Sequence, residues 1–446
     1  MFYDQPNIPA DWQVTSWTRE DASSMGYNSS NTFPVFDISK VKSLDPERDI
    51  WDNWLVVDEE GKTADVNGYN ILIALGAPVG DLSQARLMYF YSKQDENSWA
   101  PGGYVFADRL IEDTQEWSGS TIFTEDGYLQ FFYTIASSYQ DPETGIYQTN
   151  QRFATAKVPV AADSDKLQLL DPTYHELLIE PDGYLYQSVE QASRQEQRFP
   201  VQHRADLGSD QVNNFTFRDP HYFKDPADGT EYLLFEANTG EALNAEGTVR
   251  DQFIGAFPEG YQPSADDLKA NGCVGVLKLS SERTKADFLP PLLTSNLVTD
   301  EIERINVIVR GDLYYLFVVT HGNKMTVDGN DLVNRDFMIG FVSSELFGPY
   351  VPLNKTGLVI TQKSPGDPYV GQENNEQYVY SWLVVPAENG RFVVISYSNF
   401  SSDSKGTVQK IKSAGPVIEL LISGTSTRVG RILGTFDPAG SSEPLV

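Results

Sequence analysis

Three acidic stretches, far apart in the chain, carry residue types that suit chemistry on a sugar. They are Ile50–Trp54, Phe217–His221 and Thr299–Arg304, and each sets a carboxylate beside an aromatic residue or an arginine. An aromatic ring can stack on a sugar ring, and a cation keeps a neighbouring acid ionised. Each stretch alone is typical of an ordinary turn or strand end. All three in this order favour a carbohydrate-active site.

Cleavage of a glycosidic bond with retention needs a nucleophilic carboxylate and a second carboxyl group, about 5–5.5 Å away, that acts as acid and base. Asp52 lies between Trp51 and Trp54 and is suited to the direct attack, although Trp-Asp-Asn-Trp can also be a packing motif. Glu303 is the second carboxyl group. Its neighbour Arg304 would lower its pKa, so an acid role requires burial or a like charge, which Glu301 on the same strand face could supply.

The chain resembles glycoside hydrolase family 68, the levansucrases, inulosucrases and bacterial β-fructofuranosidases. The resemblance covers roughly residues 15 to 430. Besides the three acidic stretches, its motifs are Trp17–Ala22, Glu116–Ser120, Leu234–Gly240, Lys324–Gly329 and Gly348–Asn354.

The resemblance implies roles for the acidic residues. Asp52 corresponds to the family's nucleophile and Trp51 to the wall under the fructosyl ring. Glu303 corresponds to the acid/base and Glu301 to a substrate-site residue; a bulge in this stretch would leave the two open to exchange. Asp219 corresponds to the aspartate that binds two fructosyl hydroxyls and stabilises the oxocarbenium-like transition state.

The same resemblance implies a substrate-binding shell. Arg218 resembles the residue that grips the glucosyl unit, and Trp117 and Ser118 resemble the Trp-Ser pair of the sugar site. Tyr380 resembles the tyrosine that contacts the acid/base, although a buried core tyrosine would look the same in sequence. Asn214 resembles a residue at the next subsite outward.

His321 departs from the Gram-positive pattern, in which its position is often arginine; many Gram-negative members have histidine. A neutral imidazole offers one hydrogen-bond donor, whereas arginine offers a fixed fork of several. We therefore expect a weaker hold on acceptors, hence short fructooligosaccharides and hydrolysis rather than polymer.

The resemblance implies an enzyme that requires no cofactor, but Gram-positive members of the family carry a calcium ion. Its ligands correspond to positions near Asp300, Asn271 and Asn213. An aspartate expected at the last position is replaced by an amide, which lowers calcium affinity. We therefore expect no tight calcium binding, with a structural ion left open.

The interior consists of short apolar runs separated by turn residues, which predicts an all-β fold. The pairs are 69–75 with 86–91, 128–133 with 152–156, 232–236 with 275–279 and 313–318 with 337–342, and a fifth begins at 391–396. Each follows a residue singled out above. This order predicts a five-bladed β-propeller with an axial active-site funnel, as the resemblance also implies; a β-sandwich would not explain it.

The expected domain plan has an N-terminal segment at 1–15, one catalytic domain at 16–436 and a disordered tail at 437–446. A polar excursion at 239–271 includes a helix start at Ser264, with acids in the first turn. The 446 residues include 23 Tyr, 24 Phe, 34 Gly and 25 Pro, a mix that favours strands and turns.

The chain has 63 acidic against 33 basic residues, a net charge of −30, which argues against nucleic acid and anionic membranes as partners. The surface fits either an ordinary acidic secreted enzyme or one adapted to salt. Cys273 is the only cysteine, so no intrachain disulfide forms. No signal peptide is visible; we expect an extracellular monomer by resemblance, with a cytoplasmic enzyme as the alternative.

The function implied by the resemblance is a retaining, sucrose-active fructosyltransferase that forms a fructosyl-Asp52 intermediate. Its partners are sucrose and fructan or oligosaccharide acceptors. A levansucrase, an inulosucrase and a mainly hydrolytic β-fructofuranosidase remain open. A non-catalytic fructan-binding propeller would have lost Asp52, Asp219 or Glu303, and none is lost. An arabinan-cleaving propeller enzyme also disperses three acids, but the flanking residues argue against it.

Overall fold

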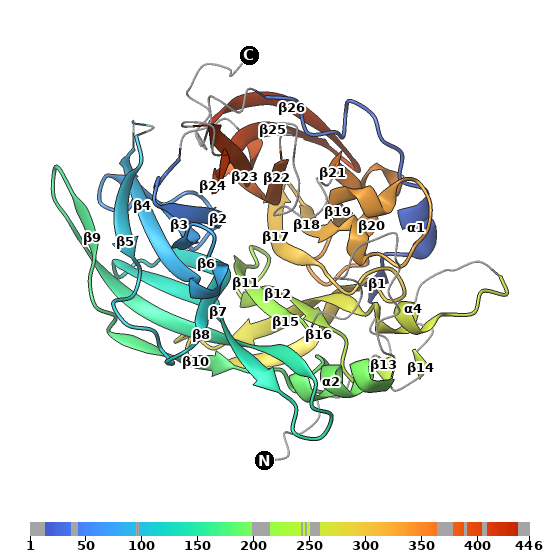
Figure 1. The fold of residues 1–446 in the computed structure, drawn as a ribbon. Coiled ribbons are helices and arrows are strands. Elements are labelled where there is room, and N and C mark those ends of the chain that lie inside the picture. The colour runs from blue at the N-terminus through green and yellow to red at the C-terminus, as the bar shows by residue number, and fades with distance from the viewer. Residues whose placement is uncertain are drawn as a thin grey trace.

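The computed structural model describes residues 14–36, 43–94, 96, 98–198, 215–241, 244–245, 248–249, 259–363, 378–387, 390–403 and 408–435. These residues form five large β-sheets arranged around one central axis (Figure 1). The arrangement is the predicted five-bladed β-propeller, and the sandwich alternative is wrong.

The first two blades follow each other along the chain. The first consists of β2 (Arg48–Leu55), β3 (Tyr69–Pro78), β4 (Arg86–Lys93) and β5 (Ala100–Tyr104). The second consists of β6 (Gln115–Phe123), β7 (Tyr128–Gln140), β8 (Tyr147–Ala162), β9 (Leu167–Leu169) and β10 (Tyr174–Ile179).

The third blade takes one strand from the N-terminal region, which pairs in parallel with its outermost strand. It consists of β11 (Phe217–Lys224), β12 (Glu231–Asn238), β15 (Gly272–Leu279), β16 (Ala286–Thr294) and β1 (Thr15–Ser16). The fourth consists of β17 (Glu303–Arg310), β18 (Leu313–His321), β19 (Arg335–Ser343), β20 (Val351–Pro352) and β21 (Leu358–Lys363). The fifth consists of β22 (Tyr378–Ala387), β23 (Arg391–Asp403), β24 (Val408–Ala414), β25 (Pro416–Ser423) and β26 (Ser426–Thr435).

All the apolar runs singled out in the sequence lie within strands of this propeller. The run at 69–75 lies in β3, where every residue before the last is buried. Both faces of such a strand pack against apolar side chains, so the sequence is continuously apolar instead of alternating. This burial explains why short apolar runs bounded by turn residues, and not an alternating pattern, identified the strands.

The first strand of each blade lies nearest the axis. β2, β6, β11, β17 and β22 each contact the inner strands of both neighbouring blades, which closes the ring (Figure 1). Side chains at corresponding heights on these strands therefore meet in one place, although they lie far apart in sequence.

Helices are short and lie outside the sheets: α1 (Arg19–Ser23), α2 (Val189–Arg198) and α4 (Ala265–Lys269). The predicted helix start is confirmed, because Ser264 caps α4 and exchanges hydrogen bonds with Asp267 in a capping box. Four 3-10 turns are η2 (Leu82–Gln84), η3 (Gly322–Lys324), η4 (Leu332–Asn334) and η5 (Leu353–Lys355), and a small hairpin pairs β13 (Asn244–Ala245) with β14 (Thr248–Val249).

None of the helices in the described ranges is long and apolar enough to cross a membrane. The tail expected at 437–446 and most of the N-terminal segment lie outside the described residues. Within that segment, Thr15 belongs to β1 and pairs with Leu293.

Candidate active site

Each of the five inner strands breaks its regular pairing where a candidate site residue lies. The breaks fall between Ile50 and Asn53, Trp117 and Gly119, Arg218 and His221, Glu303 and Asn306, and Tyr380 and Leu383. A β-bulge re-aims the side chains of its extra residues. In three of the five, a residue adopts left-handed backbone: Asp219 (φ 59°), Arg304 (φ 54°) and Ser381 (φ 59°).

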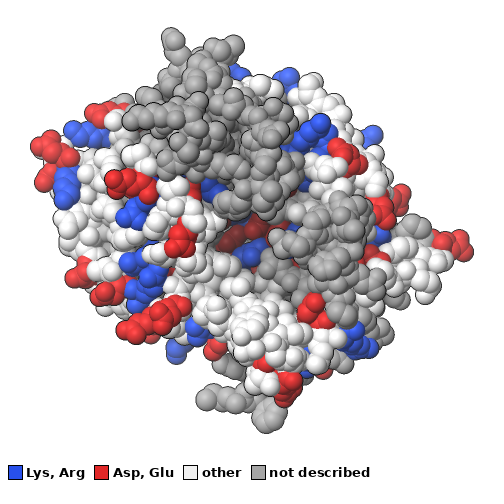
Figure 2. Space-filling view, in the orientation of Figure 1, with Lys and Arg blue, Asp and Glu red and all other residues white. Residues whose placement is uncertain are grey.

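The bulges bring most of the predicted site residues to one cavity of about 240 Å³. Its lining includes Trp51, Asp52, Trp117, Ser118, Arg218, Asp219 and Glu303. Figure 2 shows a hollow near the centre of the viewed face, with acidic and basic side chains at its floor. Four blades contribute to this lining, so the cavity exists only when the ring is closed.

Asp52 is held by a neighbouring hydroxyl. Ser118 Oγ donates to Asp52 Oδ2 at 2.5 Å, which fixes the carboxylate and leaves its other oxygen for a reacting carbon. The indole N–H of Trp117 donates to Gln115 Oε1 at 2.8 Å, which sets the orientation of that ring beside the cavity.

Glu303 accepts hydrogen bonds from two side chains that belong to different blades. Arg218 Nη2 donates to Oε1 at 3.0 Å, and the Tyr380 hydroxyl donates to Oε2 at 2.5 Å. Burial, and then the charge of Glu301, outweigh Arg218 and raise the pKa of Glu303 to about 7. A carboxyl group with such a pKa can hold a proton near neutrality and release it.

The sequence suggested that Glu301 and Glu303 share a strand face. This is wrong, because β17 begins only at Glu303 and Glu301 lies before it. It nevertheless lies close, since one nitrogen of Arg218 reaches Glu301 Oε2 at 3.4 Å. Burial raises the pKa of Glu301, but His321, Lys324 and Arg218 together lower it below its usual value. The two glutamates therefore have pKa values displaced in opposite directions, the pattern that separates an acid from a permanently charged group.

The position of Arg304 in the sequence suggested that it lowers the pKa of Glu303, but its guanidinium group lies elsewhere. Its left-handed conformation turns the guanidinium toward blade one, where Nη2 donates to the carbonyl of Asn53 at 2.6 Å. Its backbone N–H donates to Asp219 Oδ2 at 3.2 Å. The cation beside Glu303 is Arg218, supplied by another blade.

Asp219 lies among charges of both signs. Burial and the like charge of Asp52 raise its pKa, while Arg218 and Arg304 oppose them. Its own N–H donates to Thr134 Oγ1 at 3.1 Å, which anchors the bulge in blade two.

Glu236 is a site residue that sequence reasoning missed. It is fully buried and accepts from Arg218 Nε at 2.6 Å and from the Ile302 N–H at 3.2 Å. Burial raises its pKa well above the usual range, although Arg218 opposes this. Glu236 belongs to the Leu234–Gly240 motif, which the sequence analysis had singled out. Its pairing with Arg218 across β11 and β12 depends on the strand register, which the sequence alone does not show.

Asp336 is the second missed residue, and it changes the interpretation of His321. His321 Nδ1 lies 2.7 Å from Asp336 Oδ1, and its ring stacks on Tyr380 with centroids 4.0 Å apart. Burial alone lowers the pKa of His321, but Asp336, Glu301 and Glu303 raise it to about 9. The ion pair with Asp336 therefore favours the charged ring over the neutral imidazole assumed from sequence.

Two groups of residues bear on metal binding. Ligand atoms of Glu301, Glu303 and His321 lie within 4.8 Å of one another, although His321 Nδ1 faces Asp336 and both oxygens of Glu303 accept hydrogen bonds. At the position implied for calcium, Asp300 and Asn271 are both buried. They offer one carboxylate and one amide, fewer than the 6–8 oxygens typical for calcium. Asn213 and Asn214 lie outside the described residues.

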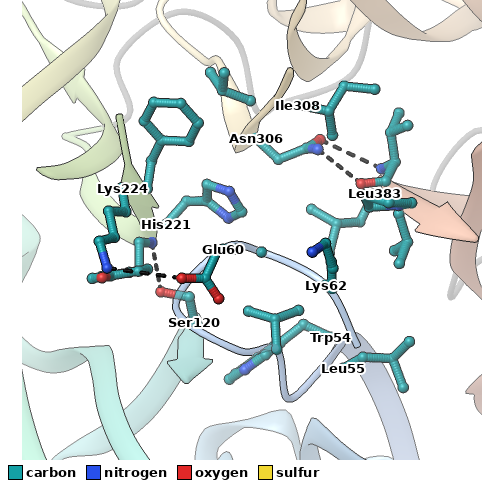
Figure 3. Close-up of a pocket in the computed structure, with 18 of the residues that line it drawn as sticks. Trp54, Leu55, Glu60, Lys62, Ser120, His221, Lys224, Asn306, Ile308 and Leu383 are labelled. Atoms are coloured by element: carbon teal, nitrogen blue, oxygen red, sulfur yellow. Dashed lines mark hydrogen bonds and ion pairs between the residues drawn. The ribbon is translucent and has the colours of Figure 1, made fainter. Parts of the chain in front are cut away.

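A larger cavity, about 570 Å³, is lined by residues further along the same inner strands and shares Asp219 with the first. Figure 3 shows part of its lining. Its walls include apolar residues such as Ile308 and Leu383, with Lys62 also in the lining. His221 lines it too, and burial, with Arg304, lowers the pKa of this histidine to about 3. The carboxylate pair expected for sugar chemistry lines the smaller cavity.

Comparison with known proteins gives a consistent result. A levansucrase of Bacillus amyloliquefaciens is 35% identical over 433 residues, covering 90% of this chain and 84% of the relative. An extracellular sucrase of Zymomonas mobilis is 32% identical over 355 residues, covering 77% and 79%. A Bacillus subtilis levansucrase structure in complex with oligosaccharides superposes with a TM-score of 0.78 at 30% identity, covering 96% and 98%. The family model described as Levansucrase/Invertase matches residues 8–435. The chain therefore belongs to glycoside hydrolase family 68.

Proposed function

We propose that this protein is a levansucrase-type fructosyltransferase that cleaves sucrose and transfers the fructosyl unit to a sugar acceptor or to water. One observation carries the proposal: Asp52, Asp219 and Glu303 line a single cavity with two tryptophans. The family and the names of its members, levansucrase and sucrase, support sucrose as the substrate.

In the first step, a carboxylate oxygen of Asp52 attacks the anomeric carbon of the fructosyl unit. The bond to the glucosyl oxygen breaks, and Glu303 donates its proton to that oxygen, so glucose leaves. Its pKa of about 7 allows Glu303 to carry this proton near neutrality. The product is a fructosyl ester of Asp52.

In the second step, Glu303 is a carboxylate and takes the proton of an acceptor hydroxyl or of water. The acceptor oxygen attacks the anomeric carbon, and the bond to Asp52 breaks. Two inversions give net retention. Asp219 stabilises the positive charge that develops on the ring, because an ionised carboxylate binds it more strongly in the transition state than in the ground state.

The remaining residues bind and orient the sugars. Trp51 and Trp117 offer stacking surfaces, and Arg218 with Glu301 holds the glucosyl side. Tyr380 keeps Glu303 oriented through its 2.5 Å hydrogen bond. His321 is proposed for the acceptor side and Asn214 for the next subsite outward.

A mainly hydrolytic enzyme is the second candidate, and the relative named extracellular sucrase favours it. Inulosucrase activity differs only in linkage. The arabinan-cleaving alternative is overturned by the family assignment. A non-catalytic fructan-binding propeller is disfavoured because the three carboxylates share one cavity.

The proposal extends to the location and organisation of the protein. We propose export from the cell, which the relative named extracellular sucrase supports, one catalytic domain spanning 16–436, and a monomer. Calcium, if bound near Asp300 and Asn271, would brace the loop before β17 and take no part in the chemistry.

The test is incubation of the purified protein with sucrose, with glucose and free fructose measured separately. Glucose in excess of fructose means transfer, and equal amounts mean hydrolysis. Asp52→Asn is the control and should release neither. Absence of glucose release from the wild-type protein would refute the proposed function.

A further inference from the structure

Arg304 is an arginine of the inner strands to which the proposed mechanism gives no role. It follows Glu303 directly in β17 and is only 4% exposed. Among the described residues, those that line the 240 Å³ cavity do not include Arg304, whereas Arg304 does line the larger cavity, which shares Asp219 with the smaller one. Its side chain is therefore not placed to hold a sugar in the smaller cavity.

The contacts of Arg304 join the three inner strands that carry the proposed carboxylates. Its guanidinium Nη2 donates to the carbonyl oxygen of Asn53 at 2.6 Å, and Asn53 follows Asp52 in β2 of blade one. Its backbone N–H donates to Asp219 Oδ2 at 3.2 Å, in β11 of blade three. Its own peptide bond joins it to Glu303 in blade four. One residue thus connects three blades at the level of the three acids.

The backbone of Arg304 has an unusual conformation that these contacts require. Its φ is 54°, and its hydrogen-bond partner Asp219 is also left-handed, at φ 59°. Left-handed backbone is uncommon outside glycine, and such strained residues persist where the surrounding structure holds them, often at functional sites. Two such residues, joined by a hydrogen bond in the irregular segments of β11 and β17, indicate a geometry that is held in place.

Burial of Arg304 also has a cost in stability. Arg304 Nε and Asn53 Oδ1 are buried and have no hydrogen-bond partner within the described part of the chain. The guanidinium carbon lies 5.8 Å from the ring centroid of Trp54, near the limit of cation–π attraction. Buried polar atoms without partners are unfavourable and call for an explanation other than stability.

We propose that Arg304 is a positioning residue, which sets the spacing of Asp52, Asp219 and Glu303 by tying their three strands together. The inference rests on the proposed function, since it assigns Arg304 to the carboxylates of that mechanism. A retaining enzyme needs its nucleophile and its acid/base about 5–5.5 Å apart. Misplacement of a reacting group by about 1 Å can lower the rate about 100-fold. Loss of the guanidinium should therefore reduce turnover more than substrate binding.

The test is Arg304→Met, which removes the guanidinium and keeps a long unbranched side chain. At a temperature where the variant is folded, kcat with sucrose should fall about 100-fold and KM should change less than about threefold. Both steps use the same three carboxylates, so the ratio of free fructose to glucose should stay at the wild-type value. Fructosyl fluoride, whose leaving group needs no proton, should not restore turnover, because the spacing of Asp52 and Asp219 is also disturbed.

Two further variants separate positioning from charge and from stability. Arg304→Lys keeps the positive charge but lacks the fixed fork of donors, so it should recover little of the lost kcat. Arg310→Met is the matched control at the other end of β17. Arg310 Nη1 donates to the carbonyl of Ile422 in blade five at 2.5 Å, and its guanidinium carbon lies 5.7 Å from the ring centroid of Phe392. This variant should lower the melting temperature and leave kcat unchanged.

Arg304→Gly replaces the methionine variant if the latter does not fold, because glycine adopts left-handed backbone without strain. The same loss of kcat is expected. A kcat near the wild-type value, a raised KM with kcat unchanged, or a changed product ratio would overturn the role of Arg304. So would recovery with fructosyl fluoride, full recovery in Arg304→Lys, or an equal loss in Arg310→Met. Absent glucose release from wild type would instead refute the proposed function.

Discussion

Arg218 is shared by three glutamates, and this shortage of positive charge determines how each behaves. Its nitrogens contact Glu236, Glu301 and Glu303 at 2.6 to 3.4 Å. One guanidinium cannot neutralise three buried carboxylates, which favours retention of protons on some of them. The pKa values of Glu236 and Glu303 rise, whereas that of Glu301 falls, because His321 and Lys324 also act on it.

This distribution predicts different outcomes for two similar substitutions. Glu303→Gln should abolish the basic limb, which in the wild-type enzyme falls as pH rises through about 7 because the acid loses its proton. It should retain partial turnover of fructosyl fluoride, whose leaving group needs no proton. Initial rates from pH 4 to 9 measure both effects. Glu301→Gln should lower activity and keep the limb; the reverse result would exchange the two roles.

We expect His321 to influence product length, but the physical reason differs from the one that the sequence suggested. The ion pair with Asp336 favours the charged ring, in which one of the two N–H donors faces Asp336. Arginine offers five donors, so it could pair with Asp336 and still hold an acceptor. We expect short oligosaccharides and hydrolysis from the wild type, and longer products from His321→Arg. Loss of a charged hydrogen bond in His321→Ala should favour hydrolysis by about tenfold.

Size-exclusion chromatography and the ratio of free fructose to glucose measure these outcomes. His321→Gln is the control, because it keeps a donor without the charge and should lie between wild type and His321→Ala. Chiefly high-molecular-weight levan from the wild type would show that product length is decided elsewhere.

At the scale of the element, the strands could be predicted and the bulges could not. Runs such as Leu313–Val318 are apolar and aromatic over the length of a strand, and this run lies within β18. Glu301 instead lies before the first residue of β17, and the irregularity after Glu303 contains Arg304 at φ 54°; no strand pattern encodes either feature. The Arg218–Glu236 pair depends on register between two strands, a long-range property.

Gly119 tests whether a bulge positions the chemistry. A Cβ at this residue would lie 1.9 Å from the carbonyl oxygen of Phe132, so Gly119→Ala must displace backbone next to Ser118. We expect a loss of about 1–3 kcal/mol in the free energy of unfolding. We also expect a fall in kcat at temperatures where the protein is folded, since the Ser118–Asp52 hydrogen bond is disturbed.

Gly275→Ala is the matched control. Gly275 lies in β15, which is not an inner strand. A Cβ at this residue would lie 2.3 Å from the ring of Phe235. Thermal unfolding should show destabilisation in both variants, with reduced kcat only in Gly119→Ala. Equal losses of kcat would mean that the bulge in β6 has no special role.

At the scale of the whole molecule, charge is distributed in two ways. Some ion pairs are largely buried, such as Arg283 with Glu59 at 2.8 Å and Arg218 with Glu236 at 2.6 Å. On the face shown in Figure 2, acidic and basic side chains are interspersed. The chain nevertheless carries a net charge of −30, so many acidic groups have no basic partner to offset them over the surface as a whole.

Net charge of this size predicts that salt stabilises the fold. Repulsion among unpaired carboxylates favours the expanded chain, and the Debye length falls from about 30 Å at 0.01 M to about 3 Å at 1 M salt. Buried pairs such as Arg218–Glu236 are screened much less, so the net effect of salt is relief of repulsion. The melting temperature should therefore rise between low salt and about 1 M NaCl, with most of the rise below about 0.2 M, where screening changes fastest.

Choline chloride should reproduce the rise if screening is the cause, whereas an equal osmolality of glycine, which carries no net charge, should not. A melting temperature that is flat or falls over this range would mean that the surface charges are well dispersed and that the salt-adapted interpretation is wrong.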